Sequence, residues 1–356
     1  MEQPDKIKQR VISPEETLIS ALKIMDRTGF RSLLVLDNCE KFAGILSIGD
    51  IQRAIITNVA LETKIGGVLR TNPRVARNKM GNDQIKEEMI RYRMEFIPVI
   101  TEDDRIDTVY FWEDLFSNKK LPPRKYFNLP VIIMAGGIGS RLKPLTNVLP
   151  KPLIPIGDKT IIEEIMGRFS DAGCNRFYLS VNYKAEMIKY YLNSLAENKY
   201  SLEYFEEKKP LGTAGSLFLI KDRIDSTFFV SNCDIIIEQD YSEILDYHYQ
   251  SKNDITLVAV LKHHAIPYGV VETGADGALI TLQEKPEITY KINSGMYILE
   301  RNVLDEIPED TFFHITELIE KMKTRGGRVG VFPVSEKSWR DIGDWTTYLI
   351  NLSDQK

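Results

Sequence analysis

Cysteine and histidine are scarce in this sequence, and their scarcity excludes several kinds of site. The 356 residues include only three cysteines and four histidines. Cys39, Cys174 and Cys233 are an odd number and show no C-x-x-C spacing, so we expect neither a disulfide framework nor a thiolate zinc site. The dispersed histidines give no support for a histidine metal cluster or a catalytic triad.

Long apolar runs and an excess of positive charge are also missing. No apolar stretch approaches the ~20 residues that a membrane-spanning helix requires, and the first residues lack the apolar core of a signal peptide. The formal net charge is −5, whereas nucleic-acid-binding proteins usually carry a clustered basic surface. We therefore expect a cytoplasmic protein that binds neither a membrane nor nucleic acid. Its length suits two domains of roughly 100–200 residues each.

The first third of the chain contains two similar units, at about residues 7–60 and 65–118. Each reads as a short strand, an amphipathic helix, two strands joined by a turn, and a second helix. The apolar residues of the first helix follow the i, i+3, i+4, i+7 spacing of one buried face, namely Leu18, Ala21, Leu22 and Met25. The corresponding residues of the second unit are Ile85, Met89 and Met94. Repeated units of this kind usually pack on each other.

The first unit resembles a CBS motif, and the pair resembles the tandem CBS module that binds adenosine or related nucleotides in many enzymes. Nucleotide-binding members contain G-x-x-[ST]-x-x-D, which reads here GILSIGD from Gly44 to Asp50. The resemblance implies that Ser47 and Asp50 bind a regulatory adenine or guanine nucleotide, and that copies of the chain associate through this module. Phe111 replaces the serine in the second unit. Without the resemblance, Asp50 is equally well explained as the cap of the next helix.

The composition changes after the two units. We place a regulatory CBS module at residues 1–121, a linker at 122–129 that begins with Pro122 and Pro123, and a second domain at 130–356. The second domain alternates apolar strands with helices, which is typical of an α/β fold with a doubly wound, mainly parallel, Rossmann-like sheet. In such sheets ligands bind at the carboxyl ends of the strands.

One glycine-rich stretch follows the first strand of this domain. Residues 134–152 read MAGGIGSRLKPLTNVLPKP. Leu142 stands where a dinucleotide fingerprint needs its third glycine, and the Walker pattern G-x-x-x-x-G-K-[ST] is absent. A loop of backbone amides with the cations Arg141 and Lys151 suits a triphosphate, although a solvated surface turn would explain an isolated G-G-x-G.

The longer run that contains this stretch resembles the signature of sugar-1-phosphate nucleotidyltransferases, which join a nucleoside triphosphate to a sugar 1-phosphate and release pyrophosphate. The resemblance covers about residues 130–350. It implies that Arg141 and Lys151 are catalytic and that Mg²⁺ binds Asp234 and Asp341, of which the latter lies in the W-x-D-x-G pattern of SWRDIGDW. The nucleotide-binding positions it implies are Ala135, Gly136, Gly137, Gly139, Ser140, Gly212, Thr213, Gly215 and Asn232.

The same resemblance implies a sugar-phosphate site in the segments YGVVE, QEKP and INSGMYIL. The matching positions are Gly269, Glu284, Lys285 and Asn293. The domain is most similar to guanylyltransferases, and its fusion to a CBS pair is similar to the glucosamine-1-phosphate guanylyltransferases of bacterial legionaminic acid synthesis. We therefore expect GTP and glucosamine 1-phosphate to give GDP-glucosamine. Mannose 1-phosphate with GTP, glucose 1-phosphate with UTP, dTTP or ATP, and a nucleotide-sensing protein without turnover remain as alternatives.

Overall fold

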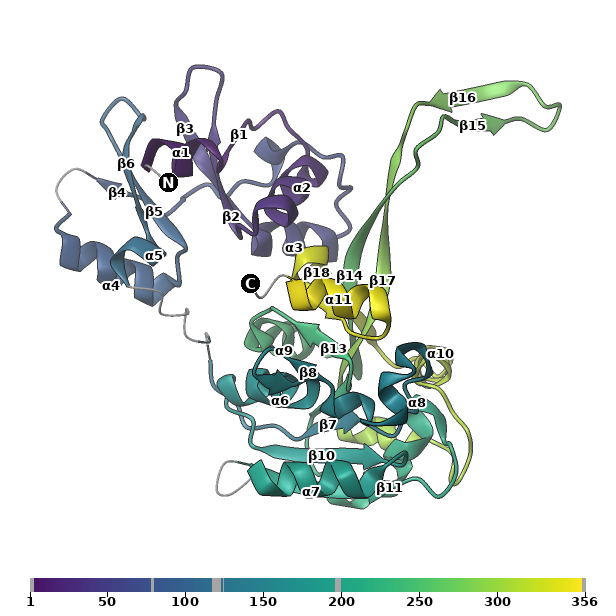
Figure 1. Cartoon of the computed structure of the whole chain (residues 1–356). Coiled ribbons are helices and arrows are strands. Elements are labelled where there is room, and N and C mark those ends of the chain that lie inside the picture. Colours follow the sequence, from purple (N-terminus) through teal and green to yellow (C-terminus); the bar gives the residue numbers. More distant parts are fainter. Residues whose placement is uncertain (1–2, 78–79, 117–122, 124, 196–199, 354–356) are drawn as a thin grey trace. The chain divides into compact units, whose positions relative to one another are not determined.

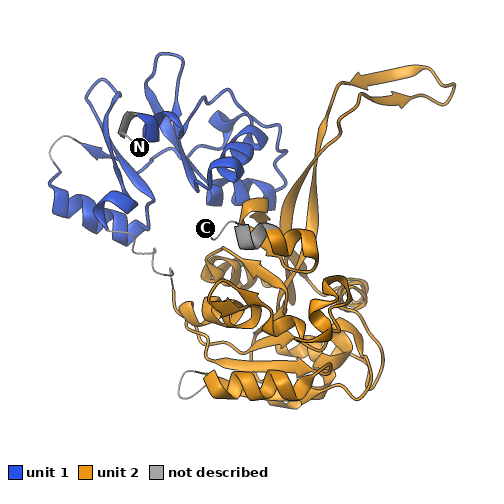
Figure 2. Cartoon of the chain, viewed as in Figure 1, with its two compact units in different colours: residues 1–124 blue, residues 125–356 orange. Residues whose placement is uncertain are grey.

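The chain forms two compact units, residues 1–124 and 125–356 (Figure 2). The structure, a computed structural model, describes residues 3–77, 80–116, 123, 125–195 and 200–353. The expected limits of the second repeat at residue 118, of the CBS module at residue 121 and of the linker at residue 122 lie outside the described residues. Within the described ranges, no helix is both long enough and apolar enough to cross a membrane.

The N-terminal unit contains two repeats of the predicted order (Figure 1). Each repeat has a three-stranded sheet in which the first strand runs parallel and the third antiparallel to the middle strand. After α1 (Gln3–Lys8), the first repeat consists of β1 (Val11–Ile12), α2 (Leu18–Thr28), β2 (Ser32–Leu36), β3 (Phe42–Ser47) and α3 (Ile48–Ile56). The second consists of β4 (Ala76–Arg77), α4 (Asn82–Tyr92), β5 (Phe96–Ile100), β6 (Ile106–Phe111) and α5 (Trp112–Leu115).

The apolar pattern of the two repeats correctly predicts which residues of their first helices are buried. The buried residues of α2 are the four that the sequence predicts, Leu18, Ala21, Leu22 and Met25. The hydroxyl of Thr17 accepts a hydrogen bond from the backbone N–H of Ser20 and so caps the first turn. Gly29 ends the helix in the left-handed region, with φ of 78°. In α4 the predicted Ile85 and Met89 are buried, whereas Met94 lies beyond the end of the helix and packs against the same cluster.

A seven-stranded sheet forms the centre of the C-terminal unit, in the order β11-β10-β7-β12-β17-β14-β18. Neighbouring strands are parallel except at β17, which is antiparallel to both β12 and β14, so the sheet is mainly parallel as predicted. The strands are β7 (Val131–Met134), β10 (Arg176–Val181), β11 (Ser201–Glu206), β12 (Phe228–Asn232), β14 (Ile255–Ala265), β17 (Glu287–Leu299) and β18 (Val329–Ser335). The helices are α6 (Ile161–Asp171), α7 (Ala185–Leu195), α8 (Gly212–Gly215), α9 (Tyr241–Gln250), α10 (Ile315–Thr324) and α11 (Trp345–Ser353).

Helices cover both faces of this sheet. On one face, the ring of Phe229 in β12 lies 5.3 Å from that of Phe169 in α6 and 6.2 Å from that of Tyr241 in α9. Adjacent residues of a strand point to opposite faces. Phe228 accordingly belongs to the core on the other face, where it shares a cluster with Leu217, which follows α8, and with Leu318 of α10. The layers confirm the predicted doubly wound fold.

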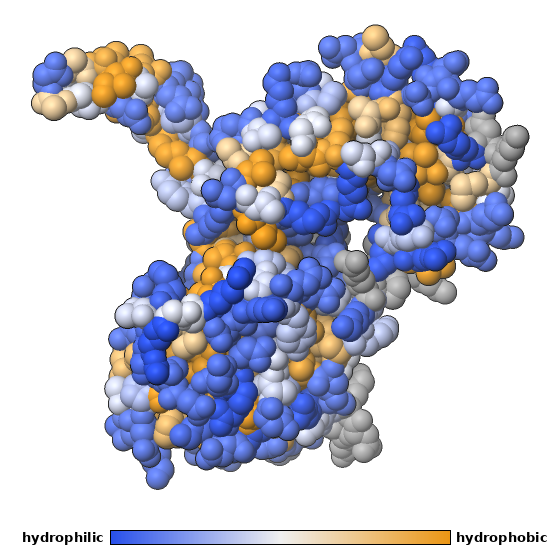
Figure 3. Space-filling view, turned by 180° about the vertical axis from the view of Figure 1, so that it is seen from behind, coloured by the Kyte–Doolittle hydropathy of each residue, from blue (hydrophilic) through white to orange (hydrophobic). Residues whose placement is uncertain are grey.

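Strands β14 and β17 extend beyond the sheet as a long arm, which the sequence analysis did not foresee (Figure 1). Its end is an antiparallel ribbon of β15 (Val270–Thr273) and β16 (Leu279–Gln283). Apolar side chains gather on the outside of this ribbon, among them Val271, Ile280 and Leu282 (Figure 3). The segments that the family resemblance assigns to the sugar phosphate therefore lie largely on this arm.

The stretch FFVSNCDIII forms two strands. It is broken at Cys233 and Asp234, where β12 ends and β13 (Ile235–Ile237) begins. Strand β12 pairs with β7 and β17, whereas β13 leaves the sheet and pairs with β19 (Trp339–Asp341) in a separate two-stranded ribbon. Two further short strands, β8 (Pro155–Ile156) and β9 (Lys159–Thr160), precede α6. The break places Asp234 at the carboxyl end of β12, beside the loop that follows β7.

Candidate active site

The glycine-rich loop begins where β7 ends. The backbone N–H of the buried Ala135 donates to the carbonyl of Ser180, and the chain then becomes exposed at Gly137. Gly139 has φ of 68°, in the left-handed region that favours glycine, and a Cβ there would lie 2.9 Å from Cγ2 of Thr146 and 3.2 Å from Cβ of Lys151. Only glycine fits this turn. Ser140, which is exposed, begins the 3₁₀ turn Ser140–Leu142 that carries Arg141.

The segment after this turn is held by residues from the β10–α7 connection. The hydroxyl of Tyr183 donates to the carbonyl of Thr146 at 3.1 Å, and Nζ of Lys184 donates to the carbonyls of Asn147 and Val148 at 2.6 and 2.7 Å. The hydroxyl of Thr146 in turn donates to the carbonyl of Gly139 at 3.0 Å. These contacts fix the loop before any ligand arrives.

Glu207 supports the loop from the other side, and sequence reasoning missed it. Its carboxylate accepts hydrogen bonds from the hydroxyl of Ser180 at 2.5 Å and from the backbone N–H of Leu211 at 3.1 Å. A Cβ on Gly136 would lie 3.3 Å from its Oε1. An acidic residue directly after a strand, at the ligand-binding edge of a parallel sheet, was the available signal.

Lys151 and Asp234 form a buried ion pair. Lys151 follows Pro150 in a 3₁₀ turn and is only 7% exposed, so its ammonium group depends on a protein partner. Its Nζ donates to Oδ2 of Asp234 in a short contact. The structure thus brings together the predicted catalytic lysine and one of the two predicted metal ligands.

Asp341 reaches the same place through the pairing of β13 with β19. In this ribbon Asp341 lies opposite Ile235, and the backbone N–H of Ile342 donates to the carbonyl of Asp234 at 2.9 Å. Oδ1 of Asp341 is buried and has no hydrogen-bond partner among the residues that the structure describes. Burial raises the pKa of Asp341, and the negative charge of Asp234 raises it further, while the cations Lys151 and Arg141 and the backbone N–H of Gly343 act in the opposite direction.

Gly343 separates Asp341 from Arg141. A Cβ at this position would lie 2.6 Å from Oδ1 of Asp341 and 2.9 Å from Nη2 of Arg141. The guanidinium group is exposed, so it remains available to an anion. The four predicted residues Arg141, Lys151, Asp234 and Asp341 therefore converge beside the glycine-rich loop.

The glycines of the PLGTAGSL segment are explained by contacts within the chain. A Cβ on Gly212, which has φ of 77°, would lie 2.7 Å from the carbonyl oxygen of Phe313, and one on Gly215 would lie 2.4 Å from that of Thr311. Neither Thr213 nor Ser216 caps the start of α8, whose N-cap is Leu211 and has no side-chain hydrogen bond. The hydroxyl of Thr213 accepts from the backbone N–H of Ile315 and so serves the first turn of α10 instead. Close packing of two chain segments is the physical reason.

The candidate sugar-phosphate residues divide into two groups. Gly295 on β17 lies against Asn232 at the end of β12, since a Cβ on Gly295 would be 2.7 Å from Nδ2 of Asn232. Asn293, two residues earlier on β17, therefore lies near Asn232. Its Nδ2 donates to the hydroxyl of Tyr297 at 2.7 Å.

The second group lies on the arm. Gly269 directly precedes β15, and Glu284 and Lys285 directly follow β16; all three are exposed. The ribbon of β15 and β16 lies away from the body of the unit that holds β7 and β13 (Figure 1). Gly269 and Glu284 approach each other, since a Cβ on Gly269 would lie 3.2 Å from Oε2 of Glu284. The structure does not bring these three residues to Lys151.

Ser47 and Asp50 form a capping box at the start of α3. Ser47 is the N-cap, so the alternative that Asp50 itself is the cap is wrong by three residues. The Asp50 carboxylate accepts from the backbone N–H of Ser47 at 2.9 Å and its hydroxyl at 2.5 Å, from Nε of Arg70 at 2.7 Å, and from Arg53 in a short contact. Burial alone would raise the pKa of Asp50, but the bonds from Ser47 and Arg70 lower it below its usual value.

The equivalent position of the second repeat is built differently. Phe111 precedes α5 without a side-chain cap, and its ring lies 4.7 Å from the guanidinium of Arg10, which also stacks 3.5 Å from Phe30. The buried Arg10 therefore occupies the space beside Phe111.

Comparisons with known families fit this two-part architecture. A model of the nucleotidyl transferase family matches residues 130–355, and a model of the CBS domain matches residues 8–57. The chain is 29% identical over 216 residues to a mannose-1-phosphate guanylyltransferase from Mycobacterium tuberculosis, which covers 60% of each protein. It is 33% identical over 232 residues to a probable mannose-1-phosphate guanylyltransferase from Oryza sativa, covering 63% of this chain and 64% of that relative. The chain spans about half to two thirds of the length of these curated relatives.

Solved structures show the same relation. HddC from Yersinia pseudotuberculosis is 28% identical, with a TM-score of 0.51, and the match covers 64% of this chain and all of HddC. The same protein in complex with GMP-PN matches at 27% identity and a TM-score of 0.50, with the same coverage. The similarity to these structures covers about two thirds of the present chain.

Proposed function

Because the chain belongs to the nucleotidyl transferase family, we propose that it transfers a nucleotidyl group from a nucleoside triphosphate to a sugar 1-phosphate. The observation that carries this proposal is the convergence of Arg141, Lys151, Asp234 and Asp341 beside one glycine-rich loop. A preformed loop, two cations and a buried carboxylate with an unpartnered oxygen suit a polyphosphate and its counter-ion.

The reaction needs no protein nucleophile. An oxygen of the sugar 1-phosphate, already anionic, attacks the α-phosphorus of the triphosphate and forms a new P–O bond. The bond from the α-phosphorus to the bridging oxygen of the β-phosphate breaks, and its electron pair leaves with pyrophosphate. Catalysis therefore consists of in-line positioning and of stabilising negative charge on the phosphates. This agrees with a site in which the residues brought together are cations, carboxylates and backbone amides.

Each residue of the cluster has a defined task in this proposal. Arg141, exposed and planar, binds the leaving phosphates by paired hydrogen bonds. Lys151 lies deeper and stabilises charge at the reacting phosphate, with Asp234 holding its ammonium group in place. The amides from Gly136 to Ser140 contact the remaining phosphate oxygens, and Gly139 allows the turn that aims them.

The carboxylates fit a magnesium ion. Mg²⁺ prefers oxygen ligands and usually takes one or two protein carboxylates together with phosphate oxygens and water. Asp341 offers a buried Oδ1 without a partner in the described part of the chain, and Asp234 lies beside it. No group of three or more potential ligands gathers in that part of the chain, at this site or elsewhere, so phosphate oxygens and water would complete the coordination. When bound, the ion would stabilise the charge of the phosphates.

We propose GTP as the donor. The supporting observations are the names of the similar curated proteins, which are mannose-1-phosphate guanylyltransferases, and the GMP-PN complex of HddC. For the acceptor, those names favour mannose 1-phosphate, whereas the CBS fusion favours glucosamine 1-phosphate and hence GDP-glucosamine. Transfer from UTP, dTTP or ATP to glucose 1-phosphate is the alternative within the class.

A pyrophosphate-release assay on the full chain tests the reaction. GTP, UTP, ATP, CTP and dTTP are crossed with the 1-phosphates of glucosamine, N-acetylglucosamine, mannose and glucose in the presence of Mg²⁺. We expect release with GTP and one hexose 1-phosphate, and its loss in Asp234→Asn but not in Asp305→Asn, a control on an exposed ion pair. Nucleotide binding without release in any combination would favour a nucleotide-sensing protein instead.

We further propose that the CBS module binds a regulatory nucleotide at Ser47 and Asp50 and joins copies of the chain. Arg53 and Arg70 are more than half exposed beside Asp50, so they offer cations to nucleotide phosphates. Calorimetry with adenine and guanine nucleotides, with Arg70→Gln as the variant, tests binding, and light scattering tests association. Identical heats in the wild type and Arg70→Gln would contradict the binding site.

A further inference from the structure

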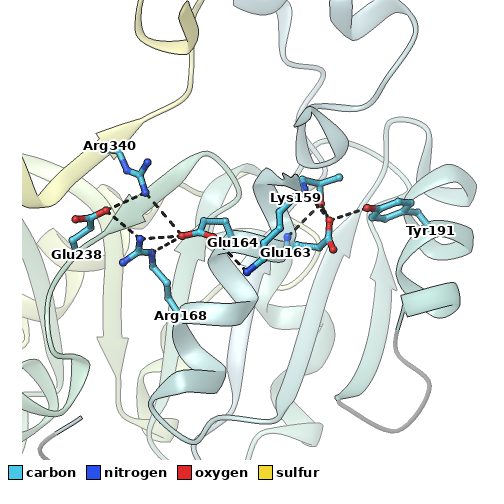
Figure 4. Close-up of polar contacts among 8 residues, drawn as sticks. Lys159, Glu163, Glu164, Arg168, Tyr191, Glu238 and Arg340 are labelled. Atoms are coloured by element: carbon cyan, nitrogen blue, oxygen red, sulfur yellow. Dashed lines mark hydrogen bonds and ion pairs between the residues drawn. The ribbon is translucent and has the colours of Figure 1, made fainter. Parts of the chain in front are cut away.

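An ion-pair cluster lies directly beside the strand that carries Asp341. Figure 4 shows Glu164 and Arg168 from α6, Glu238 from the end of β13, and Arg340 from β19. Nη2 of Arg340 lies 3.0 Å from Oε1 of Glu238 and 4.0 Å from Oε1 of Glu164. Nη2 of Arg168 lies 3.1 and 2.9 Å from the same two oxygens. Two cations thus share two carboxylates.

Three of the four side chains of this cluster are partly buried, whereas Glu238 is 47% exposed. The side chains of Arg168, Glu164 and Arg340 are 23%, 26% and 26% exposed. Isolated exposed pairs contribute little, but several partly buried charges that share partners form a network with defined geometry. Arg340 is therefore held in one place by two acidic groups at once.

Helix α6 gives the cluster a rigid base. Its apolar face is buried at Ile161, Ile162, Ile165, Met166 and Phe169. A capping box between Thr160 and Glu163 fixes its first turn, and the hydroxyl of Tyr191 in α7 donates to Glu163 at 2.7 Å (Figure 4). Arg340 is thus connected to α6 through Glu164 and through the Glu238 carboxylate that it shares with Arg168.

Strand β19, which carries Asp341, needs an attachment to the core of the unit. Strand β19 has three residues and, within the described ranges, pairs with β13 alone. A two-stranded ribbon is marginally stable by itself. Side chains alternate along a strand, so Trp339 and Asp341 face one side and Arg340 the other. On the first side, Nε1 of Trp339 donates to the carbonyl of Ser294 at 3.3 Å. Arg340 supplies the attachment on the second side.

We propose that Arg340 is a positioning residue that holds the carboxylate of Asp341 at the metal site. The pairing of β13 with β19 brings the acidic side chains of Asp234 and Asp341 together, and like charges repel, so the ribbon must resist their separation. Because Arg340 faces away from Asp341, it stabilises the ribbon without neutralising the carboxylate. This inference rests on the proposed function, since it assigns the task of Arg340 in that same site.

The affinity of the full-length protein for Mn²⁺ tests this role directly. Mn²⁺ replaces Mg²⁺ as a paramagnetic probe, and its free concentration is read by electron paramagnetic resonance without any substrate. The variants are Arg340→Gln, Arg340→Lys and Asp341→Asn. Arg301→Gln is the matched control, because Arg301 is 33% exposed and pairs with Asp305 at 3.1 Å outside the site. Thermal unfolding of each variant is measured in parallel.

We expect Arg340→Gln to raise the dissociation constant of Mn²⁺ about 10-fold, the effect typical of residues that orient metal ligands. Arg340→Lys keeps the charge and should restore most of the affinity. The melting temperature of Arg340→Gln should fall no further than that of Arg301→Gln. Unchanged Mn²⁺ affinity in Arg340→Gln, or a loss that follows the melting temperature alone, would overturn the inference.

Two further outcomes separate this inference from the proposed reaction. If Mn²⁺ binding depends on both Asp341 and Arg340 while no substrate pair releases pyrophosphate, the positioning role stands and the proposed reaction is wrong. If the wild type binds Mn²⁺ no more tightly than Asp341→Asn, the metal site is wrong and the positioning role falls with it.

Discussion

Two aspartates, one in each unit, are both largely buried but have opposite surroundings. Asp50 in the N-terminal unit accepts hydrogen bonds from Ser47, Arg53 and Arg70, and its pKa is lowered. Asp341 in the C-terminal unit has a buried oxygen without a partner in the described chain, and its pKa is raised.

The difference distinguishes a carboxylate whose hydrogen-bond partners come from the protein from one with an oxygen left for a ligand. Leaving a buried oxygen unpaired costs free energy that folding must offset elsewhere. Asp50 incurs no such cost, because the protein itself satisfies it. For Asp341, a bound cation would supply the missing partner of this oxygen and so offset the cost. We therefore expect substitutions at the two positions to have opposite effects on stability and very different effects on activity.

The largest effect should be on turnover. Asp341→Asn removes the charge that a magnesium ion needs, so kcat/KM should fall by about 100-fold or more. Steady-state rates with the substrate pair identified in the pyrophosphate assay measure this. Asp305→Asn, in an exposed pair with Arg301, should keep the rate of the wild type. A loss below about 3-fold in Asp341→Asn would contradict the proposed role of this carboxylate.

The next largest effect should be on the stability of the N-terminal unit. Asp50→Asn breaks the capping box with Ser47 and leaves Arg53 and Arg70 without their carboxylate, which should destabilise this unit by about 2 kcal/mol. Urea unfolding of the full chain measures the change, with the exposed Asp107→Asn as the control. Because the folded-state pKa of Asp50 is lowered, this contribution should be present above about pH 4 and disappear as the pH falls through the folded pKa. Equal stability of Asp50→Asn and Asp107→Asn at pH 7 would contradict the claim that the hydrogen bonds of Asp50 stabilise the N-terminal unit.

Alanine substitutions at two glycines near these aspartates should also have different effects, a loss of activity at Gly343 and a gain of stability at Gly49. A Cβ on Gly343 would approach Asp341 and Arg141 to within 2.6 and 2.9 Å, so Gly343→Ala should lower kcat/KM about 10-fold by displacing one of them. Near Asp50, a Cβ on Gly49 would have its nearest neighbours at 3.6 and 3.7 Å, which is ordinary contact. Gly49→Ala in α3 should therefore stabilise the protein by about 0.5 kcal/mol. Rate assays and unfolding of both variants test this pair.

The smallest expected effect is an increase in stability when the charge of Asp341 is removed. Without metal, the ionised form of Asp341 destabilises the folded state, so Asp341→Asn should raise the melting temperature at pH 7 by about 2 °C. A raised folded-state pKa means that stability is greatest below the unfolded value near 4 and is lost as the pH rises through the folded pKa. The advantage of the variant should therefore shrink as the pH is lowered toward 4. Calorimetry in a chelating buffer measures it, and a lower melting temperature in the variant would contradict the account.

The sequence predicted those parts of the site that depend on local pattern. The strand before the glycine-rich loop follows from its apolar run, and the family motif places Lys151 and Asp234 in one site. The pairing of Ile235 with Asp341 was not predictable in this way. It joins two three-residue strands about 100 positions apart, and no pattern in either segment specifies the partner.

The arm and the glycines of residues 212–215 escaped prediction for related reasons. The long pairing of β14 with β17 depends on register between strands that are separated by a further ribbon. Gly212 reads as a loop glycine, but its neighbour is Phe313, which the sequence places 101 residues away. Contacts of this kind are properties of tertiary packing, which local propensity does not encode.

A crystal structure of the protein with Mn²⁺ and a non-hydrolysable GTP analogue would test the central claim most directly. The anomalous signal of manganese locates the ion independently of the protein density. We predict a peak coordinated by the carboxylates of Asp341 and Asp234 and by phosphate oxygens, with Arg141 and Lys151 on the remaining phosphates. A nucleotide bound at the glycine-rich loop with the ion away from Asp341 would contradict the claim that its unpartnered oxygen is kept for the metal.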